Sequence, residues 1–294
     1  MKIRKAVIAA AGMGTRFLPQ TKAMPKEMLP LVDKPIIQYI VEELVDAGIE
    51  DIVIVTGYNK RSIEDHFDEP NSDLVEALSK DKKKLHLLDE LNNISSLANF
   101  IYIRQKKFEG NAAPLINSEH IVGNEPFIFT WGDDFIKASP TRFKQMIEVY
   151  EQYQTNILSC IEISDEADYL RYGVVSGQNF ATNLVKIDSI VEKPGKENAK
   201  SNLASVSSYI FNPEIFKYVN QVSQNLEDGQ ELSLQLAMQL MINDQHDILG
   251  YKVVDGKYYD SGNKLEYIKT VLDFGIEDPN IGSDLKDYLR QKLS

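Results

Sequence analysis

The chain has 294 residues, of which 43% are hydrophobic and 26% charged, ordinary values for a globular protein that buries a sizeable core. Its formal net charge is -12 and its pI is about 4.9, so its surface repels nucleic-acid backbones and anionic membranes. The single cysteine, Cys160, excludes an intrachain disulfide and a thiolate metal cluster. We therefore expect no nucleic-acid and no membrane partner, and an anionic substrate would need cations gathered in its pocket.

The first residues are basic and then apolar, as at the start of a signal peptide. The apolar stretch stops at Ala11, however, and a glycine-rich turn follows, which predicts a first strand instead. The sequence contains no uninterrupted apolar run of about 18 residues, the length that a membrane-spanning helix needs. We expect a cytoplasmic location.

The first half of the chain alternates short apolar strands with amphipathic helical stretches. Strands are expected at 5–11, 51–57, 100–105 and 126–130, and a helix at 36–47 that ends at Gly48. The highly charged stretch 72–92 predicts a solvated helical excursion. This alternation is typical of a largely parallel, doubly wound sheet.

The second half has a different pattern, with strands expected at 173–175, 184–191 and 203–211 and few helices between them. We expect these strands to form a smaller antiparallel, substrate-binding layer. The stretch 264–294 has apolar residues at helical spacing. The predicted fold is α/β: a Rossmann-like, doubly wound mixed sheet with an antiparallel layer and C-terminal helices.

The strongest functional signal follows the first strand, in Ala9-Ala10-Ala11-Gly12-Met13-Gly14-Thr15-Arg16. Small residues let the backbone approach a nucleotide, and free backbone N–H groups can hold its phosphates. A dinucleotide-binding fingerprint needs a third glycine where Phe17 stands, which disfavours an oxidoreductase, and a Walker loop is missing too. The basic, proline-stiffened segment up to Lys26 suits a triphosphate, and the alternative is a solvent-facing turn with incidental cations.

Four strings in this region carry a family resemblance: Ala10-Ala11-Gly12-Met13-Gly14-Thr15-Arg16-Phe17-Leu18-Pro19, Thr21-Lys22-Ala23, Pro25-Lys26-Glu27-Met28-Leu29-Pro30 and Asp33-Lys34-Pro35. They resemble the signature of bacterial UTP–glucose-1-phosphate uridylyltransferases, and the likeness runs through nearly the whole chain. It implies the nucleotide-diphospho-sugar transferase fold and a Mg²⁺-dependent reaction of UTP with glucose 1-phosphate that gives UDP-glucose and pyrophosphate.

The resemblance also implies an organisation. Residues 1–263 would form the catalytic domain, with a nucleotide half at about 1–135 and a sugar-phosphate half at about 136–263. The helical segment 264–294 would be available for contacts in a homodimer or homotetramer.

The resemblance assigns roles around the nucleotide. Ala10, Ala11 and Gly12 would lie against the uridine, and Gln105 would read the base near Gly110. The β- and γ-phosphates that leave as pyrophosphate would be held by Gly14, Thr15, Arg16 and Lys26. The cations among them would stabilise the charge that accumulates on the leaving group.

Asp133 follows a buried strand, at the position where open α/β sheets bind ligands. Mg²⁺ prefers hard oxygen ligands and needs only one or two carboxylates besides phosphate oxygens. The resemblance implies that Asp133 is the principal metal ligand and that Asp260 completes the site. The alternative is that these strand-end aspartates only cap the following elements.

The sugar-phosphate side is predicted from Glu192-Lys193-Pro194, at the end of an amphipathic strand, and from Gly173. By resemblance, Glu192 would bind sugar hydroxyls and Lys193 the sugar phosphate, which makes Lys193 a catalytic cation together with Arg16 and Lys26. A compact ammonium can neutralise a phosphate without bidentate geometry. The alternative is a surface ion pair at a strand end.

The chain departs from the family pattern at three places. Gly110-Asn111-Ala112-Ala113 replaces a Gly-x-Gly-His loop, Trp131 replaces a small aliphatic residue, and the segment 231–236 keeps Glu231 but changes the residues after it. These changes touch the base and sugar pockets and leave the phosphate-binding residues intact. They keep two alternatives open: a transferase for another nucleotide or hexose 1-phosphate, and a catalytically impaired regulator that binds nucleotide sugars.

Overall fold

A computed structural model describes residues 2–106 and 110–293, and within them the molecule is organised around one nine-stranded mixed sheet. The strand order is β5-β4-β1-β6-β11-β8-β12-β10-β9. The bounds of these strands are β1 (Lys5–Ala10), β4 (Asp51–Thr56), β5 (Asn99–Arg104), β6 (Phe127–Trp131), β8 (Asn156–Glu162), β9 (Gly173–Ala181), β10 (Leu184–Glu192), β11 (Leu203–Phe211) and β12 (Ile248–Lys252).

The first half of the chain supplies four parallel strands at one end of the sheet, as predicted, and β8 and β12 of the second half form a further parallel pair. β1 pairs in parallel with β4 on one side and with β6 on the other, and β5 extends the sheet beyond β4. β4 is apolar and almost entirely buried, as expected of a parallel strand covered on both faces. All four strands lie within one or two residues of their predicted bounds.

The antiparallel strands of the second half are also present, and they continue the same sheet. β11 pairs antiparallel with β6 and with β8, so it joins the two halves of the molecule. β9 and β10 pair antiparallel with each other at the far end. The mixed sheet is therefore confirmed, and the antiparallel layer is an extension of the main sheet.

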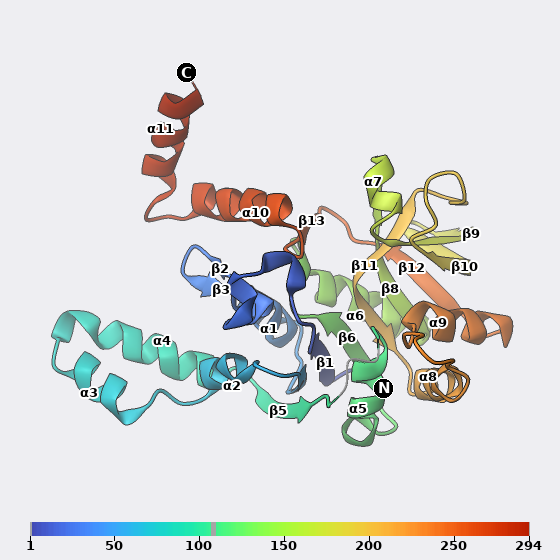
Figure 1. Ribbon diagram of the computed structural model, residues 1–294, viewed down its shortest axis with the longest axis horizontal. Coiled ribbons are helices and arrows are strands. Elements are labelled where there is room, and N and C mark those ends of the chain that lie inside the picture. The colour runs from blue at the N-terminus through green and yellow to red at the C-terminus, as the bar shows by residue number, and fades with distance from the viewer. Residues whose placement is uncertain (1, 107–109, 294) are drawn as a thin grey trace.

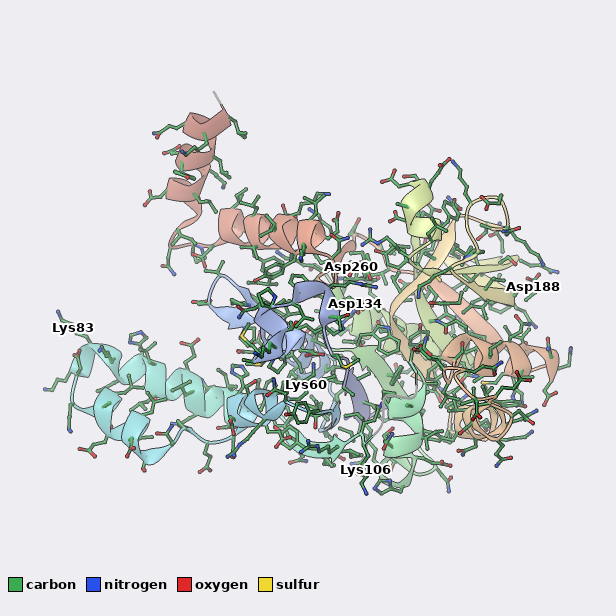
Figure 2. The ribbon with its side chains drawn as sticks, in the orientation of Figure 1. Lys60, Lys83, Lys106, Asp134, Asp188 and Asp260 are labelled. Atoms are coloured by element: carbon green, nitrogen blue, oxygen red, sulfur yellow. The ribbon has the colours of Figure 1, made fainter. Side chains whose placement is uncertain are left out.

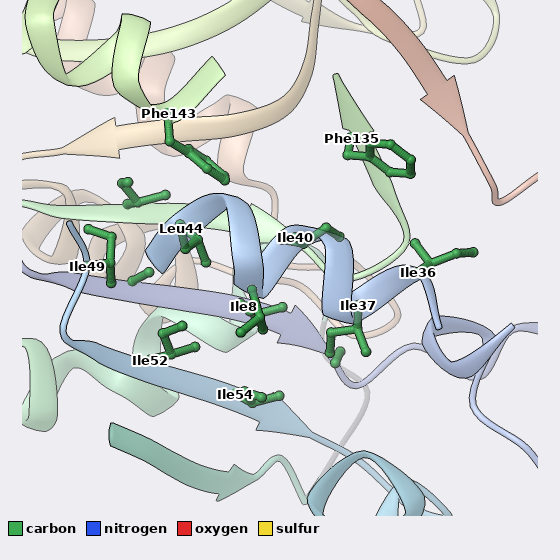
Figure 3. Packing of buried hydrophobic residues seen from close by; sticks show 14 of the residues in the cluster. Ile8, Ile36, Ile37, Ile40, Leu44, Ile49, Ile52, Ile54, Phe135 and Phe143 are labelled. Atoms are coloured by element: carbon green, nitrogen blue, oxygen red, sulfur yellow. The ribbon is translucent and has the colours of Figure 1, made fainter. Parts of the chain in front are cut away.

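Helices cover both faces of the sheet, which confirms the doubly wound arrangement. α1 (Ile36–Asp46) and α6 (Arg142–Tyr153) pack on one face, and α5 (Ala113–Val122), α8 (Ile215–Gln224) and α9 (Leu234–Asn243) on the other. Successive side chains of β1 point to opposite faces of the sheet. Ile8 therefore packs in the core on the α1 side, and Val7 packs in the core on the other side. Figure 3 shows the isoleucines of α1 over β1 and β4.

One face of α1 carries a row of apolar side chains, and this row accounts for much of the packing. Ile36, Ile37, Ile40 and Leu44 are fully buried, and each contributes about 1.5–3 kcal/mol by leaving water. On the opposite side of the sheet centre, Cys160 is buried in β8, and this burial raises the pKa of its thiol. The thiol therefore stays protonated and packs as a small apolar group.

Two helical arms extend from the body (Figure 1). α3 (Ser72–Ser79) and α4 (Leu85–Ser95) form the first, which matches the solvated helical excursion predicted at 72–92. α10 (Lys264–Glu277) and α11 (Gly282–Leu293) form the second, which matches the predicted C-terminal helices. Within the described residues, no helix is long and apolar enough to cross a membrane.

Short elements complete the part of the chain near the candidate site. The basic segment after β1 winds through 3₁₀ turns, α2 follows β4, and two small antiparallel pairs and a short helix stand apart from the main sheet. Their bounds are η1 (Thr15–Phe17), η2 (Gln20–Lys22), η3 (Lys26–Met28), β2 (Pro30–Leu31), β3 (Lys34–Pro35), α2 (Arg61–Phe67), η4 (Lys82–Lys84), β7 (Asp134–Lys137), α7 (Glu166–Tyr169) and β13 (Lys257–Asp260).

Candidate active site

Two cavities meet at Arg16 and Gly262, and between them they contain most of the predicted site residues. The first, which we call the turn cavity, has a volume of about 340 Å³ and is lined by Gly12, Met13, Gly14, Thr15, Arg16, Phe17, Lys26 and Gly262. The second, the central cavity, has a volume of about 500 Å³. Its lining includes Arg16, Asn111, Trp131, Asp133, Asp134, Arg171, Tyr172, Gly173, Glu192, Tyr209, Gln235, Tyr258, Asp260 and Gly262.

The turn cavity is formed by one continuous segment. β1 ends at Ala10, and Gly14 adopts a left-handed conformation, with φ of 65°, that starts η1. Thr21 Oγ1 donates a hydrogen bond of 2.7 Å to the carbonyl oxygen of Gly14, so the later part of the segment holds the turn. This folding brings Arg16 and Lys26 to one cavity, as predicted.

An ion pair connects the two cavities. Lys26 Nζ lies 2.6 Å from Asp133 Oδ2, and both side chains are largely buried. Burial alone lowers the pKa of Lys26, but attraction to Asp133 and Glu27 and the hydrogen bond to Asp133 outweigh it and raise the pKa above its ordinary value. Lys26 is therefore a fixed cation beside the predicted metal ligand.

Strand pairing brings the two predicted metal ligands to one place. β7 and β13 pair antiparallel with Asp134 opposite Asp260, so Asp133 and Asp260 approach each other although 127 positions separate them in sequence. Figure 2 labels Asp134 and Asp260 where these strands pair. Asp260 is held from three sides: Oδ2 accepts hydrogen bonds from Arg171 and from the Tyr172 hydroxyl, and Oδ1 accepts one from the Gly262 backbone.

Asp134 lines the central cavity together with this pair but has different partners. Its Oδ2 accepts a hydrogen bond of 2.8 Å from the Tyr258 hydroxyl, while Oδ1 is buried without a partner among the described residues. Burial and the nearby charge of Asp133 raise the pKa of Asp134, Arg142 opposes them, and the net effect is a pKa of about 7. Of the two neighbouring aspartates, only Asp133 forms an ion pair in the described structure.

The residues present fit a magnesium ion. A Cβ placed on Gly262 would stand 3.0 Å from Asp260 Oδ1, 3.3 Å from Arg16 Nη1 and 3.5 Å from Asp133 Oδ2, so the glycine lets the two carboxylates and the Arg16 guanidinium approach one point. In the described part of the chain, no three His, Cys, Asp or Glu side chains are grouped to hold a metal ion. Mg²⁺, which takes one or two carboxylates and completes its shell with phosphates and water, suits such a site.

The residues predicted to bind the sugar phosphate are placed by another strand pair. Glu192 lies opposite Gly173 where β10 pairs with β9, and both line the central cavity. Lys193 does not line either cavity: its ammonium lies 3.0 Å from Glu192 Oε1, and its side chain is 51% exposed. The structure thus brings together Gly173 and Glu192, with Lys193 beside them.

Four residues predicted to bind the nucleotide line neither cavity: Ala10, Ala11, Gln105 and Gly110. Ala10 is buried at the end of β1, and Gln105 is buried just after β5, where its backbone N–H donates to Thr56. Their roles remain predictions.

The segments that depart from the family pattern meet in the central cavity. Sequence analysis did not predict that they meet. Asn111 Nδ2 donates to Gln235 Oε1 at 3.0 Å, and Asn111 Oδ1 accepts from the Leu234 backbone at 2.8 Å. Trp131 lines the same cavity. No local pattern pairs Asn111 with Gln235, because they are 124 positions apart. Sequence analysis also missed Arg171 and Tyr258, although Arg171 lies close to Gly173 in the sequence and Tyr258 lies close to Asp260.

The glycine turn and its cations lie beside strand-end carboxylates and a second cavity, all on one α/β sheet. This combination is typical of a transferase that acts on phosphate groups. Residues 5–274 match the family model described as nucleotidyl transferase, and the chain belongs to this family. It is 42% identical over 290 residues to a UTP–glucose-1-phosphate uridylyltransferase of Staphylococcus epidermidis, covering 99% of this chain and 98% of that one. It is also 42% identical over 293 residues to the Bacillus subtilis protein of the same name, covering 100% and 98%.

Solved structures of similar proteins have the same fold as this chain. A UDP-glucose pyrophosphorylase complexed with UDP-glucose superposes with a TM-score of 0.84 at 37% identity, covering 94% of this chain and 100% of that one. A UTP-bound UGPase from Acinetobacter baumannii gives 0.87 at 34% identity, covering 98% of each chain.

Proposed function

We propose that this chain transfers the uridylyl group of UTP to glucose 1-phosphate, releasing pyrophosphate and UDP-glucose. The names of its full-length relatives support this activity. The observation that carries it is the Lys26–Asp133 ion pair, which places a cation and a carboxylate between the turn cavity and the central cavity. The nucleotide's phosphates would extend from the first cavity to this pair, and the sugar phosphate would enter from the second.

The reaction is a direct displacement. A phosphate oxygen of glucose 1-phosphate attacks the α-phosphorus of UTP in line with the departing pyrophosphate. The attacking oxygen is already anionic, so no general base and no covalent enzyme intermediate are needed. Arg16 and Lys26 stabilise negative charge on the leaving group, and alignment of the two substrates supplies much of the remaining acceleration.

Asp133 and Asp260 would hold Mg²⁺, the former as principal ligand. When bound, this ion supplies positive charge that neutralises the phosphate oxygens. Arg171, Tyr172 and the Gly262 backbone orient Asp260 so that Oδ1 faces the side of Asp133.

Glu192 binds sugar hydroxyls, Gly173 lets the sugar ring lie close to the backbone, and Lys193 neutralises the sugar phosphate. On the nucleotide side, Ala10, Ala11 and Gly12 lie against the uridine, Gly14 and Thr15 help to hold its phosphates, and Gln105 and Gly110 serve the base.

The protein would assemble as a homodimer or homotetramer through the segment 264–294. Leu265 and Ile268 of α10 are 61% and 54% exposed, and Ile281 beside α11 is 44% exposed. Large apolar side chains grouped on one arm suit contact with a second copy.

A pyrophosphate-release assay over a grid of substrates tests the function. It combines UTP or dTTP with glucose 1-phosphate or N-acetylglucosamine 1-phosphate. UTP with glucose 1-phosphate is expected to give the highest kcat/KM. A higher value for another pair would assign a different substrate, in keeping with the altered residues Asn111, Trp131 and Gln235 in the central cavity. Binding of UDP-glucose without any pyrophosphate release would identify a regulator instead.

A further inference from the structure

A buried ion pair lies beneath the proposed phosphate site, and the mechanism does not use it. Lys60 Nζ lies 2.6 Å from Glu27 Oε2, and the side chains are 4% and 0% exposed. Glu27 follows Lys26 in η3, while Lys60 comes from the turn between β4 and α2 (Figure 2). Among the described ion pairs, this is the one with both side chains under a tenth exposed.

Glu27 packs directly against the backbone that carries Asp133. A Cβ placed on Gly132 would stand 3.0 Å from Glu27 Cγ, so a larger residue there would displace the glutamate or the turn. The backbone N–H of Gly132 in turn donates to Ala9 at the end of β1. The Glu27 side chain therefore fills the space beside the residue immediately before the proposed metal ligand.

The turn that carries Lys60 holds the basic segment at a second point as well. Asn59 Nδ2 donates a hydrogen bond of 2.8 Å to the carbonyl oxygen of Lys22. The turn thus contacts the segment once near η2 and once in η3, on either side of the stretch that leads to Lys26. Charges then alternate from Lys60 to Glu27 and from Lys26 to Asp133, each pair at 2.6 Å.

Stability alone does not account for such a pair. Removing two charges from water costs several kcal/mol per ion, and apolar replacements of similar volume are often equally stable. Fixed geometry is worth more at a phosphate-transfer site, where a displacement of about 1 Å can cost about 100-fold in rate. Glu27 Oε1 is fully buried without a hydrogen-bond partner in the described structure, so the pair is not optimised as a hydrogen-bonding network.

We propose that Lys60 and Glu27 are positioning residues for the transfer reaction, which fix Lys26 and the Gly132–Asp133 turn so that ammonium and carboxylate meet phosphates and metal in one geometry. The inference rests on the proposed function. Neither residue lines the turn cavity or the central cavity.

The test replaces both charges at once by apolar side chains, in the double variant Glu27→Met/Lys60→Met, which leaves no unpaired buried charge or amide. We expect a thermal unfolding midpoint within a few degrees of wild type, because the change is neutral in charge and close in volume. Turnover at saturating substrates should fall about tenfold or more, with smaller changes in KM. The Kd of Mn²⁺ for the UTP-bound protein, measured by electron paramagnetic resonance, should rise about tenfold, as when groups behind a metal ligand are removed.

Glu76 on α3 and Lys80, the residue just after this helix, offer a matched control, with the same residue types at the same 2.6 Å but 70% and 71% exposed. Glu76→Met/Lys80→Met should change neither turnover nor Mn²⁺ affinity. Glu27→Asp is a second test, because it keeps the charge but withdraws the side chain from Gly132. Glu27→Asp should weaken Mn²⁺ binding while the protein stays folded. Glu76→Asp should leave Mn²⁺ binding unchanged.

Folded Glu27 variants with wild-type turnover and Mn²⁺ affinity would overturn the proposal. A loss of turnover that merely equals the loss of folded protein would overturn it too. Failure of the function itself is distinguishable: the wild-type protein would then release no pyrophosphate from UTP and glucose 1-phosphate, whereas Mn²⁺ affinity still reports on the position of Asp133.

Discussion

The turn cavity and the central cavity are built in opposite ways. The lining of the turn cavity comes from residues 12–26, with Gly262 as the one distant contributor among its described residues. The lining of the central cavity comes from residues spread between Arg16 and Asn263, joined by strand pairing. A contiguous segment keeps its geometry through local turns, whereas a dispersed cavity depends on the register of distant strands.

The two cavities also differ in the charges of their lining residues. The turn cavity contains Arg16 and Lys26 and no acidic side chain among its lining residues. The central cavity contains three aspartates and Glu192, together with Arg16 and Arg171. An acidic protein thus concentrates cations where pyrophosphate would leave and oxygen ligands where metal and sugar would bind. On the proposed function, phosphate binding would be a local property of the chain and sugar choice a long-range one.

The largest expected effect is in the turn cavity. Lys26→Met should reduce kcat about 100- to 1000-fold, because it removes a preorganised cation at developing charge. Its thermal midpoint should also fall, since Asp133 loses its ion pair. Lys22→Met, on an exposed position of the same segment, is the control. A Lys26→Met enzyme within tenfold of wild type would show that the turn cavity does not carry the chemistry.

Lys193→Ala tests the cation beside the central cavity. Turnover should fall about 100-fold, while UTP binding by calorimetry stays within twofold, because Lys193 would serve the sugar phosphate alone. Folding should be unaffected, since the side chain is half exposed. Lys196→Ala, on a neighbouring exposed lysine, should be silent. Near-normal turnover of Lys193→Ala would remove this residue from the mechanism.

A double-mutant cycle tests whether the central cavity depends on long-range contacts. Asn111→Ala and Gln235→Ala should each raise the KM for glucose 1-phosphate about tenfold and leave the KM for UTP nearly unchanged. Because the two side chains share a hydrogen bond, their effects should be coupled by about 0.5–3 kcal/mol. Strict additivity, or an equal effect on UTP, would mean that the two segments do not act together on the sugar side.

The smallest effect on chemistry is expected from the C-terminal arm, which lies outside both cavities. Deletion of residues 279–294 should change turnover per chain less than about threefold, because α11 buries only Gly282 among its described residues. The mass of the assembly, measured by light scattering, should fall if the arm joins two copies. An unchanged mass would contradict the proposed contact.

Prediction from sequence succeeded where the determinants are local. Seven strands of the main sheet and α1 were predicted from apolar periodicity, whereas β8 and β12 were not predicted. The turn cavity follows from glycines and cations within one segment. The approach of Asp260 to Asp133 was inferred from family resemblance, and its physical cause, the register of β7 with β13, is not visible locally. The contacts of Asn111 with Gln235 and of Lys60 with Glu27 depend on how distant loops pack, so periodicity and spacing did not reveal them.

The central claim is that transfer takes place where the two cavities meet. A crystal structure with UDP-glucose and Mn²⁺, with the metal located by its anomalous scattering, tests it most directly. We predict the metal on the Asp133 carboxylate, the diphosphate beside Arg16, and the sugar in the central cavity near Glu192. A diphosphate bound outside both cavities, or a metal remote from Asp133, would contradict the account.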